Sequence, residues 1–170
     1  MSRFFNIIPV DDAVAVVRGI APAMVPVAVP VERAAGRILA APVAADTDIP
    51  GFDRSVVDGF AVRAADTAGA GDSIPAMLRC TGRIAMGQTT VPAIGPGECA
   101  YVPTGGTLPK GADAVVMVEY SEEASDTVLI KKAAAHGENV LLRDEDFTRG
   151  EIVFSAGRRI SPQDAGVLAA

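Results

Sequence analysis

The sequence has few of the residues that most often carry catalysis and metal binding. It contains one histidine, two cysteines and no tryptophan among 170 residues. A histidine-rich metal site or a histidine-based catalytic dyad would depend on His136 alone, and no serine lies in a GxSxG motif. Cys80 and Cys99 form no CxxC pair, and they cannot complete a tetrahedral zinc site without other ligands. We expect both cysteines to be reduced residues of a folded core.

Long apolar runs are absent as well. The longest one, residues 20–31, contains Pro22, Pro26 and Pro30 and is too short for a membrane helix. The apolar run at the N-terminus is interrupted by Pro9 and then by acidic residues, so it is not a signal peptide. Positive charge is scarce, because 15 Lys and Arg residues oppose 21 Asp and Glu residues and leave a net charge of −6. We expect a cytoplasmic protein that binds neither membranes nor nucleic acid, while a site for a small anion stays open.

Hydrophobic residues make up 49% of the chain, which excludes disorder and allows a buried core. Near the N-terminus, an apolar stripe with acidic residues in its first turn predicts a helix over residues 10–20. Residues 24–29 alternate around prolines and are expected to be an extended edge segment. The alanine-rich residues 31–41 are expected to be helical despite Gly36, and a helical pattern returns after Val140.

The middle of the chain has a different character. Of the 17 glycines, 12 lie between Gly51 and Gly137, where short apolar runs alternate with turn signals. These runs predict strands near residues 59–63, 76–80, 99–102, 114–119 and 127–130. The continuous apolar run within the fourth of them predicts a strand buried on both faces. We therefore predict an α+β protein in which a small β-rich domain, residues 50–140, is inserted into an α/β-containing domain split between residues 1–49 and 141–170.

The C-terminal residues predict a helix that begins after Ser161. Serine is a good N-cap, Pro162 suits the first helical position, and Asp164 places an acid in the first turn. No glycine stop, basic last turn or following proline ends this helix before residue 170. We expect the chain to be part of a longer protein.

Three segments combine residue types that could bind ligands. The first, residues 48–63, gathers three aspartates, a serine and two arginines in a loop that leads into a strand. Its Asp58-Gly59 turn pair predicts a free carboxylate at the entrance of that strand. The alternative is that Asp58 caps a turn while Asp53 pairs with an arginine. For a lone Asp-Gly pair, this alternative is the favoured interpretation.

The other two segments carry glycines and acids. In residues 104–113, two glycines could turn backbone amides toward an anion beside threonine hydroxyls and Lys110. The order is not that of a Walker A loop, and a tight connection between strands is the favoured alternative on spacing alone. Residues 136–146 end in three consecutive acids, whose mutual repulsion favours the binding of a cation such as Mg²⁺. A solvated acidic loop is the favoured alternative for this segment by itself.

Taken in order, these segments resemble the molybdopterin molybdenumtransferase family, which includes MoeA and the gephyrin E domain. Residues 36–40 resemble its GRILA segment, 50–63 its PxFDNSxMDGYAV signature, 103–119 its TGAxxPxGADAVVxxE segment, 137–150 its GxNxRxxGEDxxxG segment, and 161–170 the helix that follows. The motifs are long, ordered and correctly spaced over nearly the whole chain. The sequence departs from the family pattern at four positions. Val57 replaces the usual Met, Phe60 the usual Tyr, Arg54 a common Asn, and Asp144 an expected Gly. The last of these loses backbone freedom and adds a charge.

The resemblance implies an enzyme that inserts molybdenum from molybdate into adenylated molybdopterin and depends on a divalent cation such as Mg²⁺. It also implies a homodimer whose active cleft lies between the N-terminal part of one subunit and a later pterin-binding domain of the other. We expect that domain and a final β domain to lie outside these 170 residues. The residues implied to be catalytic are Asp58, Thr104 and Asp146, of which the two aspartates are also implied metal ligands. The residues implied to contact substrate are Ser55, Gly105, Glu119 and Glu145.

We therefore expect this chain to be the N-terminal part of a molybdenum cofactor biosynthesis enzyme. It would supply one wall of the cleft and would be inactive alone. The alternative is a free-standing binding or dimerisation module of the same fold without catalytic activity.

Overall fold

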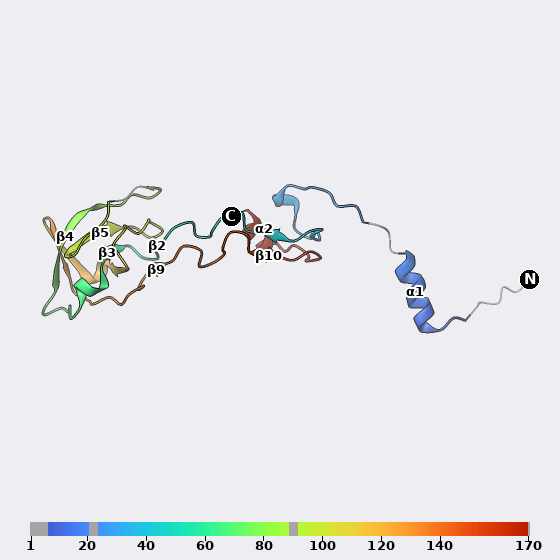
Figure 1. The fold of residues 1–170 in the computed structure, drawn as a ribbon, viewed down its shortest axis with the longest axis horizontal. Helices are drawn as coiled ribbons and strands as arrows, with labels where there is room; N and C mark the ends of the chain where they lie inside the picture. Colours follow the sequence, from blue (N-terminus) through green and yellow to red (C-terminus); the bar gives the residue numbers. More distant parts are fainter. Residues whose placement is uncertain (1–6, 21–23, 89–91, 170) are drawn as a thin grey trace, which may run out of the picture. The chain divides into compact units, whose positions relative to one another are not determined.

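The computed structural model describes residues 7–20, 24–88 and 92–169 (Figure 1). The described part combines many short strands with a few helices, which confirms the mixed α and β class. No helix within it is long and apolar enough to cross a membrane. Two compact units are distinguished, one of Met1–Ala41 with Ala156–Ala170 and one of Pro42–Ser155. The predicted domain ranges stay a prediction.

A six-stranded sheet dominates the unit Pro42–Ser155 (Figure 1). Its strands are β3 (Gly59–Val62), β4 (Ala76–Arg83), β5 (Glu98–Val102), β6 (Ala114–Met117), β7 (Ser121–Ala124) and β8 (Thr127–Ile130). They lie in the order β6-β3-β5-β4-β8-β7, and all neighbours are antiparallel except β4 and β5. The strands predicted in the middle of the chain are confirmed. The sequence did not predict β7, because its Ser-Glu-Glu-Ala run has no apolar alternation.

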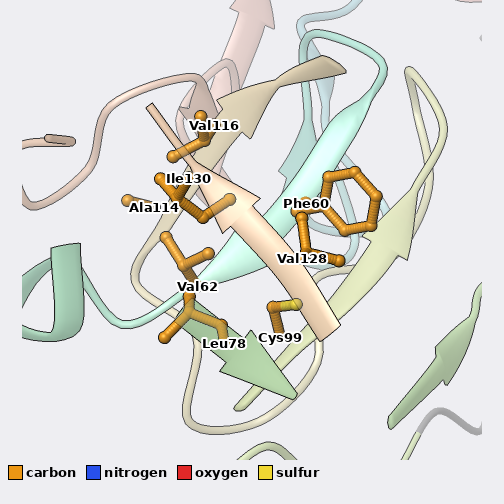
Figure 2. Packing of buried hydrophobic residues seen from close by; sticks show 8 residues of the cluster. All are labelled: Phe60, Val62, Leu78, Cys99, Ala114, Val116, Val128 and Ile130. Atoms are coloured by element: carbon orange, nitrogen blue, oxygen red, sulfur yellow. The ribbon is translucent and has the colours of Figure 1, made fainter. Parts of the chain in front are cut away.

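The sheet is held by two clusters of buried apolar side chains. The first, drawn in Figure 2, contains Phe60, Val62, Leu78, Cys99, Ala114, Val116, Val128 and Ile130. The second contains Ala61, Ile84, Ile94, Ala100, Val102 and Val115. Successive residues of β6 enter different clusters, as the alternation of side chains along a strand requires, so this strand is buried on both faces as predicted.

Both cysteines belong to neighbouring strands of this sheet. Cys80 of β4 is the register partner of Cys99 of β5. Both are free thiols, Cys99 buried and Cys80 half-buried, which confirms the expectation of reduced core residues. Burial raises the pKa of the Cys99 thiol to about 12, and the neighbouring Cys80 adds to the shift.

Two further strand pairs join segments that are far apart in the sequence. They are β1 (Val43–Ala44) with β10 (Ile152–Phe154), and β2 (Arg54–Ser55) with β9 (Val140–Leu141), and both are antiparallel. The helical pattern expected after Val140 is therefore wrong for the residues that precede Ser161. Asp144 and Gly150 have positive φ angles of 62° and 88°, which a right-handed helix does not accommodate.

The other unit holds both α-helices that the structure describes. The predicted helix over residues 10–20 is confirmed as α1 (Val10–Ile20), and none of its residues is buried. The predicted helix over 31–41 is wrong, because only the short 3₁₀ helix η1 (Val31–Arg33) forms there. Gly36 is left-handed with a φ of 82°, and its amide donates to the carbonyl of Ile160 at 2.8 Å. Residues 24–29 form neither a helix nor a paired strand.

The C-terminal helix α2 (Pro162–Leu168) begins where the sequence predicts. Ser161 Oγ accepts a hydrogen bond from the Asp164 amide at 3.0 Å, and the Asp164 carboxylate accepts one from the Ser161 amide at 3.0 Å. These reciprocal bonds form a capping box. Arg158 donates two further hydrogen bonds to the Asp164 carboxylate. The guanidinium of Arg158 and the Ser161 amide lower the pKa of Asp164 to about 2.

Candidate functional site

The first and second ligand-type segments meet at Asp58 and Thr104. Asp58 precedes β3 and Thr104 follows β5, and Gly59 and Val102 are register partners in these two strands. Both the amide and the hydroxyl of Thr104 donate to Oδ1 of Asp58, at 2.7 and 3.0 Å. The prediction that the Asp58 carboxylate is free is therefore wrong for this oxygen. Its other oxygen, Oδ2, makes no hydrogen bond within the described residues and is the one open to a ligand.

Glycine is needed at position 59 because of the packing of two strands, and not because of the turn predicted for the Asp-Gly pair. A Cβ on this residue would lie 2.1 Å from the carbonyl oxygen of Val116 in β6. The glycine therefore allows β3 and β6 to approach, and it fixes the backbone directly beside Asp58. The carbonyl of Asp58 in turn accepts a hydrogen bond from the Val118 amide at 3.1 Å.

Glu119 follows Val118 in the 3₁₀ helix η3 (Val118–Tyr120). It is thus one residue away from the backbone partner of Asp58, and its side chain is exposed. The predicted substrate contact of Glu119 stays a prediction, on the side of the site formed by the end of β6.

Ser55 and the glycines of the second segment interlock through their backbones. The amide of Gly105 donates to the Ser55 carbonyl at 2.7 Å, and the Ser55 amide donates to the Gly106 carbonyl at 3.0 Å. Ser55 is 1% exposed, and its hydroxyl donates to the carbonyl of Val57 at 2.5 Å. These internal hydrogen bonds stabilise the loop. The substrate contacts of Ser55 and Gly105 stay predictions.

The loop does not offer its first amides to an anion. The Thr104 amide is bound by Asp58, the Gly105 amide by Ser55, and the Gly106 amide by the Pro103 carbonyl at 2.8 Å. Hydrogen bonds within the protein therefore already satisfy the donors that an anion cradle would need. The favoured alternative, a tight connection between strands, describes this segment.

Glu145 and Asp146 lie in a separate exposed loop between β9 and β10. The side chain of Glu145 accepts from the Leu142 amide at 2.9 Å, and the Asp146 amide donates to the Ile49 carbonyl at 2.9 Å. Asp144 has a φ of 62°, the left-handed conformation in which glycine is most at ease. This backbone conformation explains why the resemblance leads us to expect glycine at position 144. Aspartate adopts the same conformation at a higher energetic cost.

The candidate residues therefore form two groups. Ser55, Asp58, Thr104 and Gly105 are brought together by direct hydrogen bonds, whereas none of the contacts described above joins Asp58 to Asp146. Within residues 7–20, 24–88 and 92–169, no three His, Cys, Asp or Glu side chains are grouped in a way that could hold a metal ion. The described residues thus do not by themselves fit the Mg²⁺ ion implied for Asp58 and Asp146, and we assign no step to it.

Sequence reasoning gave no role to Asp48 and Arg143, which form an ion pair in this unit. The Arg143 guanidinium donates to Asp48 Oδ2 through Nε at 2.9 Å and through a second nitrogen. The Arg149 amide donates to Asp48 Oδ1 at 2.9 Å, and the Arg143 amide donates to Asp53 Oδ1 at 2.8 Å. The Arg149 amide and the Arg143 guanidinium hold the pKa of Asp48 below its usual value. No local pattern reveals a pair separated by 95 residues.

Residues 8–170 match the family model described as the MoeA N-terminal region (domain I and II). The chain belongs to this family. The resemblance to the molybdopterin molybdenumtransferases is thereby confirmed.

Curated relatives and solved structures of the MoeA family agree with this assignment. A molybdopterin molybdenumtransferase of Staphylococcus aureus (strain MSSA476) is 36% identical over 164 residues, which are 96% of this chain and 39% of that protein. One of Bacillus subtilis (strain 168) is 35% identical over 145 residues, 83% of this chain and 34% of that protein. The crystal structure of a molybdopterin biosynthesis moeA protein from Pyrococcus horikoshii OT3 superposes with a TM-score of 0.78 at 36% identity, covering 83% of this chain and 37% of that one. The chain spans less than half the length of these relatives.

Proposed function

We propose that this chain forms the N-terminal part of a molybdopterin molybdenumtransferase, which inserts molybdate-derived molybdenum into adenylated molybdopterin. In this proposal it supplies one wall of an active cleft between two subunits of a homodimer in the cytoplasm. The finer domain arrangement, residues 1–49 plus 141–170 around 50–140, belongs to the same proposal. The observation that carries it is the Asp58–Thr104 contact, which joins two signature segments through residues 46 positions apart in the sequence.

The contact restricts what each side chain can do for a ligand. The single hydroxyl proton of Thr104 is directed to Asp58, so Thr104 Oγ1 acts toward a ligand as an acceptor. A ligand hydroxyl or N–H can therefore bind it, whereas an unprotonated oxyanion oxygen must first displace Asp58. The Asp58 carboxylate accepts hydrogen bonds and repels oxyanions, which favours the donor groups of a pterin over free molybdate at this point.

The proposal is tested in a hybrid protein, in which residues 8–169 replace the matching N-terminal region of the Bacillus subtilis relative. We expect the hybrid to restore molybdenum insertion in cells that lack their own enzyme. Asp58→Ala should abolish insertion, because it removes the carboxylate that faces the ligand and orients Thr104. Asp72→Ala, which removes an exposed acid elsewhere in the same unit, is the matched control.

Two outcomes contradict the proposal in different ways. Full insertion by the Asp58→Ala hybrid would show that the site is assigned wrongly. A folded hybrid that inserts no molybdenum, in cells where the unaltered Bacillus subtilis relative does so, would favour the alternative of a module without catalytic activity.

A further inference from the structure

One side chain, that of Asp48, accepts hydrogen bonds near both ends of the segment that carries Glu145 and Asp146. Asp48 Oδ2 accepts hydrogen bonds from the Arg143 guanidinium, and Asp48 Oδ1 accepts one from the Arg149 amide. Arg143 and Arg149 stand immediately before and a few residues after the three consecutive acids. A single carboxylate therefore closes the loop between them.

The backbone of the loop is also held by hydrogen bonds to the two residues that follow Asp48. Asp144 donates its amide to the Pro50 carbonyl at 3.0 Å, and Asp146 donates its amide to the Ile49 carbonyl at 2.9 Å. Asp144 holds an unfavourable left-handed conformation, and three adjacent carboxylates repel one another. Without a clamp, both effects favour an opening of the turn.

The charge of Arg143 also affects the three acids of this loop. Its guanidinium lies one residue before the three acids and is the nearest cation to them in the sequence. If it were unpaired, it could turn to Glu145 or Asp146 and neutralise them. The Asp48 side chain, only 15% exposed, holds this guanidinium in an ion pair instead.

We propose that Asp48 is a positioning residue of the site, because it closes the loop that carries Glu145 and Asp146 and holds the Arg143 guanidinium away from them. This inference rests on the proposed function, since it gives Asp48 a role in presenting residues of that same site. It assigns no contact between Asp48 and substrate.

The closure is tested by hydrogen exchange in the 170-residue chain, independently of any activity. In Asp48→Ala, we expect the Arg149 amide to exchange at least tenfold faster, with faster exchange at Asp144 and Asp146, while the amides of β3 and β5 stay unchanged. Asp46→Ala removes an exposed acid two residues away and should leave all these rates as they are. Unchanged exchange at Arg149 in Asp48→Ala would overturn the proposal.

The role of Arg143 is tested by rescue in the hybrid protein. Asp48→Asn keeps an acceptor for the Arg149 amide but releases the guanidinium, and we expect kcat for insertion to fall about tenfold with little change in KM. Adding Arg143→Gln should restore at least half of the lost activity, because no free guanidinium then remains beside Glu145 and Asp146. If Asp48 only held the loop closed, adding Arg143→Gln would restore no activity. A double variant no better than Asp48→Asn would therefore overturn the proposal.

The hydrogen-exchange experiment and the rescue experiment distinguish a failure of this inference from a failure of the proposed function. An inactive wild-type hybrid would contradict the function, and the exchange rates would still decide whether Asp48 closes the loop. If Asp48→Ala does not fold, Asp48→Asn takes its place in the exchange experiment, with faster exchange at Asp144 and Asp146 expected and unchanged rates overturning the proposal.

Discussion

Gly59→Ala is the substitution for which the structure makes the sharpest prediction. The added Cβ would lie 2.1 Å from the Val116 carbonyl oxygen and 2.9 Å from a methyl group of Val115, whereas real Cβ atoms essentially never come closer than 3.0 Å to another heavy atom. The first neighbour is backbone, so no rotamer change relieves the clash. β3 and β6 must therefore move apart by about 1 Å at this point.

The cost of this movement follows from the ladder that it disturbs. β3 pairs with β6 over Gly59–Val62, and a hydrogen bond lengthened by about 1 Å is lost. Losing two ladder bonds near Gly59 costs about 2 kcal/mol, and the strain of overpacking adds about 1–3 kcal/mol. We expect a total loss of about 3–5 kcal/mol, a large part of the stability of an ordinary domain.

Tyrosine fluorescence during urea denaturation measures this loss in the right part of the protein. The chain has no tryptophan, and its two tyrosines, Tyr101 and Tyr120, both belong to the unit Pro42–Ser155. The urea midpoint of Gly59→Ala should fall by about 2 M. Gly71→Ala is the matched control, because its Cβ meets nothing within 4 Å, and it should change stability by no more than about 0.5 kcal/mol. Equal midpoints for the two variants would refute the reasoning.

Two further predictions concern the acidic loop and the C-terminal helix. Asp144→Gly should stabilise the unit by about 0.5–1 kcal/mol in the same assay, since it relieves a left-handed aspartate and removes one of three like charges. A lower urea midpoint than wild type would contradict this. Asp164 has its pKa lowered from 3.8 to about 2, so the stability it contributes to α2 is present above about pH 4 and is lost as the pH falls through about 2. NMR of the Asp164 amide should follow this loss, and an Asp164→Asn variant that keeps the same acid transition would exclude the mechanism.

The fold was predictable from the sequence where its cause is local. The stripe over 10–20 and the Ser161 cap specify helices by themselves, because their periodicity and capping groups lie within one short segment. The strands of the middle region follow from short apolar runs between glycines. The prediction over 31–41 failed because Gly36 and its neighbours bond to residues near Ile160, and no local propensity reveals such a partner.

The site was predictable in its members but not in its contacts. Asp58 and Thr104 were both selected from their segments, yet only the pairing of β3 with β5 shows that the threonine donates to the aspartate. The glycines at 105 and 106 suggested an anion cradle, and the structure shows their amides bonded within the protein. Asp48 was part of the first segment and had no role until its partners appeared.

The sequence by itself determined the family, the class of fold and the residue types of the site, because ordered motifs and hydrophobic periodicity are properties of contiguous residues. Only the tertiary structure decided which donors and acceptors satisfy one another. Asp48 and Arg143 are 95 residues apart, and Gly59 is constrained by a carbonyl in another strand. Such contacts depend on strand register and on the close approach of backbones, which arise only when distant segments are assembled into the folded unit.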